Sequence, residues 1–198
     1  MYKNIVFDYG MVLVRFEGEE ISRHFMSEED AAVFAPVFFD RLYWDRLDRG
    51  TFEREEMLDD VMRRLPHFSR ELAGRVFDEW FEVLRPIDGM PELVTALRKK
   101  GHRLYLISDI AKNFAANAHR LPIISDFDGR VMSSTLGITK PNPEIFNYLL
   151  KTYSLDPAEC IFIDDRIGNV EGARAVGMAG YHFDGNAQKL AAFLGAEN

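Results

Sequence analysis

The fold is decided by a short stretch near the start of the chain, Ile5-Val6-Phe7-Asp8-Tyr9-Gly10-Met11-Val12. Three apolar residues precede an aspartate, and a glycine follows the aspartate by two positions. Short apolar runs with polar ends are typical of strands buried on both faces of a parallel sheet. Asp8 would then stand at the carboxyl end of its strand, where it can act as a nucleophile or a metal ligand. Taken alone, the stretch is explained equally well by an aspartate that caps a helix or forms a turn.

Two later apolar runs have the same form as the first. Residues 103–107 end at Ser108, and residues 161–163 end at Asp164. Helical segments that open with a proline in the first turn lie before and between these runs. This alternation predicts an α/β fold, a Rossmann-like parallel sheet flanked by helices and joined by right-handed crossovers. Ligands of such sheets bind beyond the carboxyl ends of the strands, where the three polar residues that end the runs would meet.

A long segment after the first strand has a different pattern. Strand-like runs disappear there and helical spacing replaces them. Ser27 precedes an acidic first turn as an N-cap would, and Gly50 separates an aromatic helix from the next one. We therefore predict an all-helical cap of about residues 15–86, inserted into an α/β core of residues 1–14 and 87–198.

Composition excludes several classes of protein. A chain of 198 residues that is 47% hydrophobic can bury one core and carry one smaller module. Its net charge of -8 argues against nucleic acid as the main partner, because phosphate backbones are bound by clustered Lys and Arg. No apolar run approaches the roughly 20 residues of a membrane span, and the single cysteine, Cys160, excludes a disulfide framework. We expect a cytoplasmic monomer or homodimer that binds neither nucleic acid nor membrane.

Two motifs offer groups that bind phosphate. In Leu104-Tyr105-Leu106-Ile107-Ser108-Asp109 a hydroxyl ends a strand and is expected to open a helix, so that Ser108 and helix N–H groups would form a phosphate cradle. A plain N-cap explains this serine nearly as well. In Gly137-Ile138-Thr139-Lys140-Pro141-Asn142-Pro143-Glu144 the stiff prolines present Lys140 at a low entropic cost. This setting makes an ordinary surface lysine the weaker interpretation.

A fourth motif carries two adjacent carboxylates, Asp164 and Asp165, at the end of an apolar strand. Neighbouring carboxylates repel each other unless a cation or a proton lies between them. Magnesium, which prefers oxygen ligands, would supply that cation. A solvated surface pair is the poorer explanation, because the strand before it is apolar.

The four motifs in this order are far more specific than any one of them. Over essentially its full length the sequence resembles the haloacid dehalogenase-like hydrolase superfamily, including the helical cap of its subfamily I. In that family the aspartate of the first motif attacks phosphorus, the hydroxyl and the lysine hold phosphoryl oxygens, and the acidic pair binds magnesium. The resemblance implies a phosphatase that hydrolyses a small phosphorylated metabolite through an aspartyl phosphate. The implied site residues are Asp8 and Lys140 for catalysis, Ser108, Asp109 and Lys140 for substrate binding, and Asp8, the carbonyl of Gly10, Asp164 and Asp165 for Mg²⁺.

The chain departs from the family pattern at Gly10. Family phosphatases usually carry a second aspartate at this position, which protonates the leaving group and then activates water. Losing a general acid typically costs about 10² to 10⁴ in rate. Three explanations remain: a good leaving group such as an acyl, aryl or anomeric phosphate, a substitute carboxylate from the linker or cap such as Glu17, or weak catalysis on a fold that mainly binds. The complete remaining motifs favour the first two, and the Asp-x-Gly-x-Val form resembles a subgroup that contains sugar 1-phosphate phosphatases.

Other activities of the same superfamily are less well matched. The dehalogenases that name the superfamily have a first motif of the form Asp-x-Tyr-Gly-Thr, with one more residue before the Tyr-Gly pair than Asp8-Tyr9-Gly10 allows. Their fourth motif usually lacks the two adjacent acids. A phosphomutase needs the general acid that Gly10 does not supply. In the cap, a loop around Gly50 resembles the segment with which family caps reach the site, and just before it lie Arg41, Tyr43, Trp44 and Arg46. An interpretation of Tyr43 and Trp44 as cap-core aromatics is at least as good.

Overall fold

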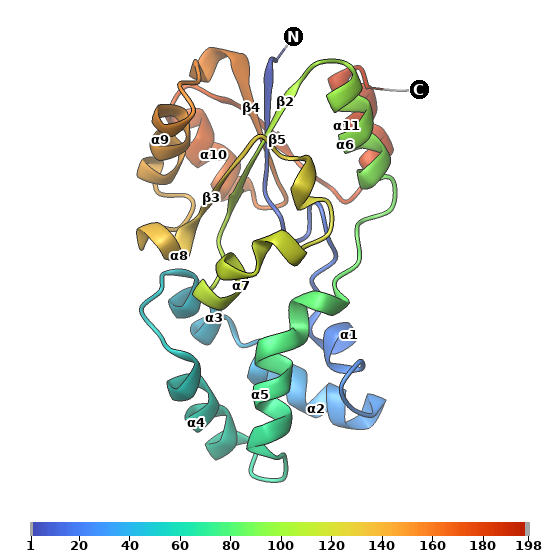
Figure 1. The fold of residues 1–198 in the computed structure, drawn as a ribbon, viewed down its shortest axis with the longest axis vertical. Helices are drawn as coiled ribbons and strands as arrows, with labels where there is room; N and C mark the ends of the chain where they lie inside the picture. Colours follow the sequence, from blue (N-terminus) through green and yellow to red (C-terminus); the bar gives the residue numbers. More distant parts are fainter. Residues whose placement is uncertain (1, 197–198) are drawn as a thin grey trace.

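The computed structural model describes residues 2–196, and its centre is a sheet of five parallel strands (Figure 1). In spatial order the strands run β3-β2-β1-β4-β5. The chain therefore adds β2 and β3 on one side of β1, and then returns to add β4 and β5 on the other side. Such a reversal places the ligand crevice at the carboxyl ends of the two strands where the order changes, here β1 and β4. The strands are β1 (Asn4–Phe7), β2 (Arg103–Ser108), β3 (Gly129–Met132), β4 (Cys160–Asp164) and β5 (Ala179–His182).

Helices cover both faces of the sheet, which confirms the predicted α/β class. In Figure 1, α6 (Met90–Lys99) and α11 (Ala187–Leu194) lie on one side of the sheet, and α9 (Pro143–Thr152) and α10 (Ile167–Ala175) lie on the other. The side chains of β1 alternate between two hydrophobic clusters, so that Val6 packs in a different cluster from its neighbours. Because both clusters are apolar, the strand has no polar face, and its sequence shows no alternation.

Local capping explains where several helices begin. The side chains of Ser27, Ser69 and Asn142 each accept a hydrogen bond from a backbone N–H in the first turn of the helix that follows. Such a bond satisfies one of the N–H groups that have no partner within the helix. The N-cap predicted at Ser27 is therefore confirmed. The expectation that a helix begins directly after Ser108 is wrong, because the next helix begins four residues later, at Lys112.

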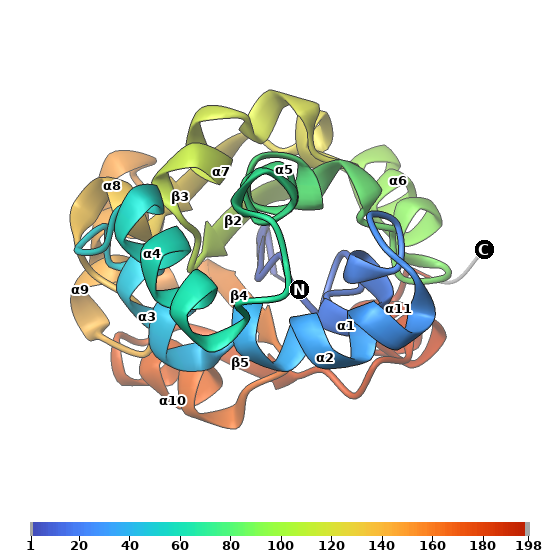
Figure 2. The same cartoon turned by 90° about the horizontal axis from the view of Figure 1, so that it is seen from below.

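A layer of helices lies beyond the carboxyl edge of the sheet, at the bottom of Figure 1, and Figure 2 shows it from below. Its members are α1 (Gly18–Ser22), α2 (Glu28–Phe38), α3 (Arg41–Asp48), α4 (Arg54–Arg64), α5 (Arg70–Glu79) and the 3-10 helix η1 (Trp80–Val83). Two segments connect the layer to the sheet, and they run side by side: the Arg15 N–H donates to the Arg85 carbonyl at 2.9 Å, and the Ile87 N–H donates to the Leu13 carbonyl at 2.9 Å. The domain boundaries predicted at about residues 14 and 87 fall on this pair of segments, and the division itself stays a prediction.

Short elements complete the core. They are α7 (Lys112–Ala116), α8 (Ser133–Leu136) and the 3-10 helices η2 (Ala118–Arg120), η3 (Ile124–Asp126) and η4 (Pro157–Glu159). Within residues 2–196, no helix combines the length and the apolar character that crossing a bilayer requires.

Candidate active site

The centre of the site is a buried ammonium between two carboxylates from adjacent strand ends. Lys140 Nζ lies 2.6 Å from Asp8 Oδ1 and 3.0 Å from Asp164 Oδ2. It also donates to the carbonyl of Ile107, at 3.2 Å. Burial alone would lower the pKa of Lys140, but the neighbouring carboxylates outweigh it and raise that pKa above its usual value. Lys140 is therefore a permanent positive charge at the floor of the site.

Asp164 is fully buried and held by several donors at once. Its Oδ1 accepts from the Arg166 N–H at 2.8 Å, and the Asn169 amide donates to both of its oxygens, at 3.1 and 3.0 Å. Together with Lys140, these contacts occupy both carboxylate oxygens. Buried charges require such partners. Its neighbour Asp165 is instead half-buried and lines the open cavity.

The donor set fits a divalent cation. Asp8, Asp164 and Asp165 each offer a carboxylate oxygen, and these oxygens lie within 4.8 Å of one another. Burial, and then the charge of Asp164, raise the pKa of Asp165. A cation among these hard oxygen ligands would relieve the repulsion that this shift records. Gly10, the other predicted ligand, lines the same cavity.

The loop that carries Lys140 is fixed from two sides. The Lys140 N–H donates to Asp109 Oδ1 at 3.0 Å, which ties the loop to the end of β2. On the other side α10 approaches so closely that a Cβ built on Gly172 would lie 2.6 Å from the Pro141 carbonyl oxygen. Asp109 thus orients the lysine loop, and its predicted contact with substrate stays a prediction. Ser108 is buried in the cavity wall beside it.

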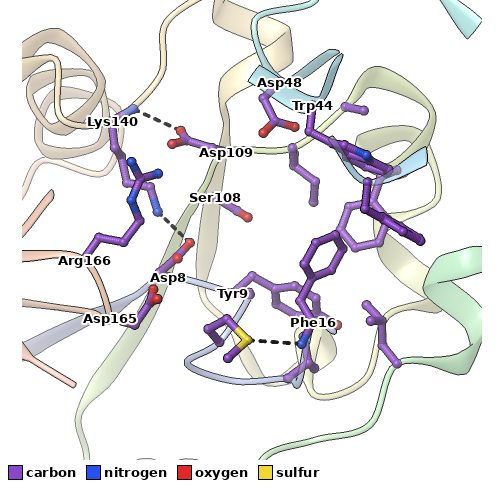
Figure 3. Close-up of a pocket in the computed structure, with 18 of the residues that line it drawn as sticks. Asp8, Tyr9, Phe16, Trp44, Asp48, Ser108, Asp109, Lys140, Asp165 and Arg166 are labelled. Atoms are coloured by element: carbon purple, nitrogen blue, oxygen red, sulfur yellow. Dashed lines mark hydrogen bonds and ion pairs between the residues drawn. The ribbon is translucent and has the colours of Figure 1, made fainter. Parts of the chain in front are cut away.

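A cavity of about 230 Å³ opens above this floor (Figure 3). Its volume suits a small ligand, and its two halves differ in chemistry. The floor holds the charged groups described above. The opposite wall is aromatic, and its rings pack against one another: Trp80 and Phe114 are stacked with their centroids 4.7 Å apart, and Phe16 meets Trp80 edge to face at 5.2 Å. The aromatic residues of the lining are Tyr9, Phe16, Phe39, Trp44, Trp80 and Phe114.

The helical layer contributes one face of α3 to the cavity, and Asp48 is the residue of that face that no sequence motif identified. Arg41, Trp44 and Asp48 of α3 all line the cavity. Their spacing of three and four residues puts them on one face of a helix, a pattern that the sequence itself displays. Burial raises the pKa of Asp48 to about 8, and the nearby carboxylates of Asp109 and Asp45 add to this effect. Asp48 is therefore a proton-bearing acid inside the cavity at neutral pH.

Other candidates from the helical segment lie elsewhere. Glu17 lies in a separate small hollow with Arg15 and His24, outside the cavity lining. Tyr43 is buried in the helical layer, where its hydroxyl donates to Asp60. Tyr43 is therefore a buried aromatic of the helical layer and does not line the cavity, whereas Trp44 does.

The chain belongs to the haloacid dehalogenase-like hydrolases. The model of that family matches residues 2–177, and the resemblance found in the motifs is confirmed. Asp8, Ser108, Lys140 and the acidic pair all fall within the matched region.

Two relatives of the chain are named phosphatases. It is 31% identical to a sesquiterpene phosphatase of Aspergillus oryzae over 143 residues, which cover 70% of this chain and 71% of that protein. It is 28% identical to a D-ribitol-5-phosphate phosphatase of Bacteroides thetaiotaomicron, over 90% of both chains. Among solved structures, a HAD-like family hydrolase from Porphyromonas gingivalis superposes with a TM-score of 0.74 at 26% identity, over 100% of both chains.

Proposed function

We propose that the protein is a magnesium-dependent phosphatase that hydrolyses a small phosphate monoester through an aspartyl phosphate on Asp8. The observation that carries this proposal is the floor of the cavity, where the Asp8 carboxylate lies 2.6 Å from the Lys140 ammonium and close to the oxygens of two further carboxylates. This arrangement combines a nucleophile, a fixed positive charge and a cation site. Membership of a hydrolase family with phosphatase relatives supports it.

Each residue of the floor has a distinct part in the reaction. Asp8 attacks phosphorus, which displaces the alcohol and forms the aspartyl phosphate. Lys140 stabilises the negative charge on the phosphoryl oxygens during transfer, because its own charge is permanent. The Ser108 hydroxyl donates to a phosphoryl oxygen from the cavity wall. Water then attacks phosphorus and releases phosphate and free Asp8.

The cation would be held by Asp8, Asp165 and the Gly10 carbonyl. Asp164 would lie on the side of the cation that faces the protein interior. When bound, Mg²⁺ supplies charge neutralisation that lets a dianionic phosphate approach a carboxylate. Asp165 is the freer member of the acidic pair, because both oxygens of Asp164 already accept hydrogen bonds. The helical layer acts as a cap that keeps bulk water from the reacting atoms.

The aromatic wall selects the leaving group. Rings from both the sheet loops and the helical layer face the side of the cavity away from the charged floor. Apolar and flat surfaces gain most from such a wall, through burial and ring stacking. We therefore propose an ester whose alcohol carries an aromatic or unsaturated hydrocarbon group, in preference to the hexose phosphate that the motif subgroup indicates.

Phosphate release from a panel of esters tests the function. The panel contains 4-nitrophenyl phosphate, benzyl phosphate, a prenyl phosphate and glucose 1-phosphate, each with Mg²⁺ and with EDTA. The proposal predicts magnesium-dependent turnover that Asp8→Asn abolishes, with a higher kcat/KM for the aromatic and prenyl esters. Asp126→Asn, which changes an exposed carboxylate of η3 outside the cavity lining, is the matched control and keeps full activity. The absence of release from every ester by folded protein would refute the proposal in favour of a dehalogenase or a non-catalytic binding protein.

A further inference from the structure

We infer that Asp48 is the general acid and base of this site, a role that rests on the proposed phosphatase function. The phosphatase needs a proton donor for its leaving group, and Gly10 has no side chain to provide one. Asp48 reaches the same cavity from a different element, the carboxyl end of α3.

The geometry places Asp48 across the cavity from the nucleophile. Figure 3 shows its carboxyl group on the side of Asp109, with Ser108 drawn between it and Asp8, and with Asp8 and Asp165 on the opposite side. A phosphoryl group bound at the floor would direct its leaving oxygen away from Asp8, because attacking and leaving oxygens lie roughly in line. The leaving oxygen therefore points into the half of the cavity that Asp48 lines.

Hydrogen bonds to the core fix the end of α3. The Ser133 hydroxyl donates to the Asp48 carbonyl at 2.6 Å and accepts from the Ile110 N–H at 2.8 Å. A Cβ built on Gly50 would lie 3.0 Å from the Ser134 carbonyl oxygen, so the loop after α3 also packs directly on the core. Asp48 is thus held in position by the sheet domain, although it belongs to the helical layer. Such preorganisation is what a catalytic group requires.

The surroundings of Asp48 keep it protonated. Burial is the largest cause of its raised pKa of about 8, and the carboxylates of Asp109, Asp45 and Asp8 act in the same direction, while Lys140 opposes them. A general acid works best when its pKa lies near the working pH. The half-buried carboxyl group can therefore donate at neutral pH, whereas an exposed aspartate would already be ionised.

Other groups of the cavity lining are less suited to the role. Asp109 uses one carboxylate oxygen to hold the Lys140 N–H. Arg41 and Arg166 line the cavity but do not release a proton near neutral pH. Glu17 lies outside the lining.

The proton balance closes over the two steps. In the first, the bond between phosphorus and the ester oxygen breaks while the Asp8 oxygen bonds to phosphorus, and the Asp48 proton passes to the leaving alkoxide. The products are the alcohol, the aspartyl phosphate and ionised Asp48. In the second, a water oxygen bonds to phosphorus, its proton passes to Asp48, and the bond to Asp8 breaks. Phosphate leaves, and both aspartates return to their starting states.

The test compares two esters of similar shape, 4-nitrophenyl phosphate and 4-nitrobenzyl phosphate, in wild type, Asp48→Asn, Asp48→Glu and the control Asp126→Asn. The nitrophenolate leaves without a proton, whereas the benzyl alkoxide requires one. For Asp48→Asn we expect turnover of the benzyl ester to fall about 10² to 10⁴-fold. With the phenyl ester the same variant should release a burst of about one nitrophenolate per site and then turn over slowly, because only the water step lacks its base. Asp48→Glu should recover part of the turnover. In wild type we expect kcat to decline above about pH 8, as Asp48 loses its proton, and this decline should disappear in Asp48→Asn.

The outcomes separate this assignment from the function on which it rests. Benzyl ester turnover in Asp48→Asn within threefold of Asp126→Asn, while wild type is active, would overturn the role of Asp48 alone. An equal loss of the first step with both esters, in a variant that unfolds at the wild-type temperature, would do the same, because the defect would then not concern proton transfer. A wild-type protein that releases phosphate from neither ester would overturn the phosphatase, and the assignment of Asp48 with it.

Discussion

Replacing Gly172 by alanine tests how α10 positions the lysine loop. Helix propensity alone predicts a gain of about 1 kcal/mol, because Gly is a poor residue in a helix interior. The added Cβ, however, would lie 2.6 Å from the Pro141 carbonyl oxygen and 3.0 Å from the Phe146 ring. The first neighbour is backbone and cannot rotate away, so the helix or the loop must move. Overpacking of this kind costs typically 1–3 kcal/mol, which outweighs that gain, and we expect a net loss of up to about 2 kcal/mol.

The same helix offers a matched control. Gly168, also in α10, is exposed and has no atom within 4 Å of an added Cβ. Gly168→Ala should therefore stabilise the protein, by up to about 1 kcal/mol, so the two changes should have opposite signs. Urea unfolding followed by circular dichroism measures both, and kcat of Gly172→Ala should also fall because the displaced loop carries Lys140. Equal or greater stability of Gly172→Ala relative to Gly168→Ala would refute the packing described here.

Three further predictions concern the charged groups of the cavity. Lys140→Met should lower the free energy of unfolding by about 3–5 kcal/mol, because it leaves two buried carboxylates without their cation. Urea unfolding in EDTA measures this loss, and a change below about 1 kcal/mol would contradict it. Asp165→Asn should weaken Mg²⁺ binding strongly, because it removes a direct ligand. Loss of a group that only hydrogen-bonds to a metal ligand weakens binding roughly 10- to 100-fold, and we expect a larger effect here. Titration calorimetry measures the affinity, and an unchanged value would exclude Asp165 as a ligand. Asp48, whose pKa is raised to about 8, keeps a proton in the folded protein that the unfolded chain loses above about pH 4. Its contribution to stability should therefore decline as the pH rises from 4 to 8, and thermal unfolding of Asp48→Asn should lack that part of the pH dependence; identical profiles would argue against the shift.

The sequence reveals the central strands better than the edge strands. Strands β1 and β4 are buried along their whole length and read as short apolar runs. Strand β5 (Ala179–His182) lies at an edge of the sheet and contains no fully buried residue, so no apolar run marks it. Strand β3 (Gly129–Met132), at the other edge, buries only its last two residues. The periodicity of side chains is therefore informative only where neighbours cover both faces.

The candidate site divides in a similar way between what local motifs reveal and what they do not. Asp8 and Asp164 are brought together because the ends of adjacent parallel strands lie at one edge, which strand order alone predicts. Asp48 comes from α3, which lies outside all four motifs, and no local pattern predicts which face of that helix turns to the sheet. The spacing of Arg41, Trp44 and Asp48 fits one face of a helix, but only the packing of α3 on the core identifies that face as the one that lines the cavity.

The most direct test of the central proposal is to find the covalent intermediate. The protein is mixed with 4-nitrophenyl phosphate and Mg²⁺, quenched in acid within the first turnover, digested and analysed by mass spectrometry. A nucleophilic Asp8 predicts one added phosphoryl group on the peptide that contains Asp8, increased in Asp48→Asn because water attack is slowed, and absent in Asp8→Asn. Phosphate release by wild type and Asp48→Asn without any phosphorylated Asp8 peptide would contradict the account.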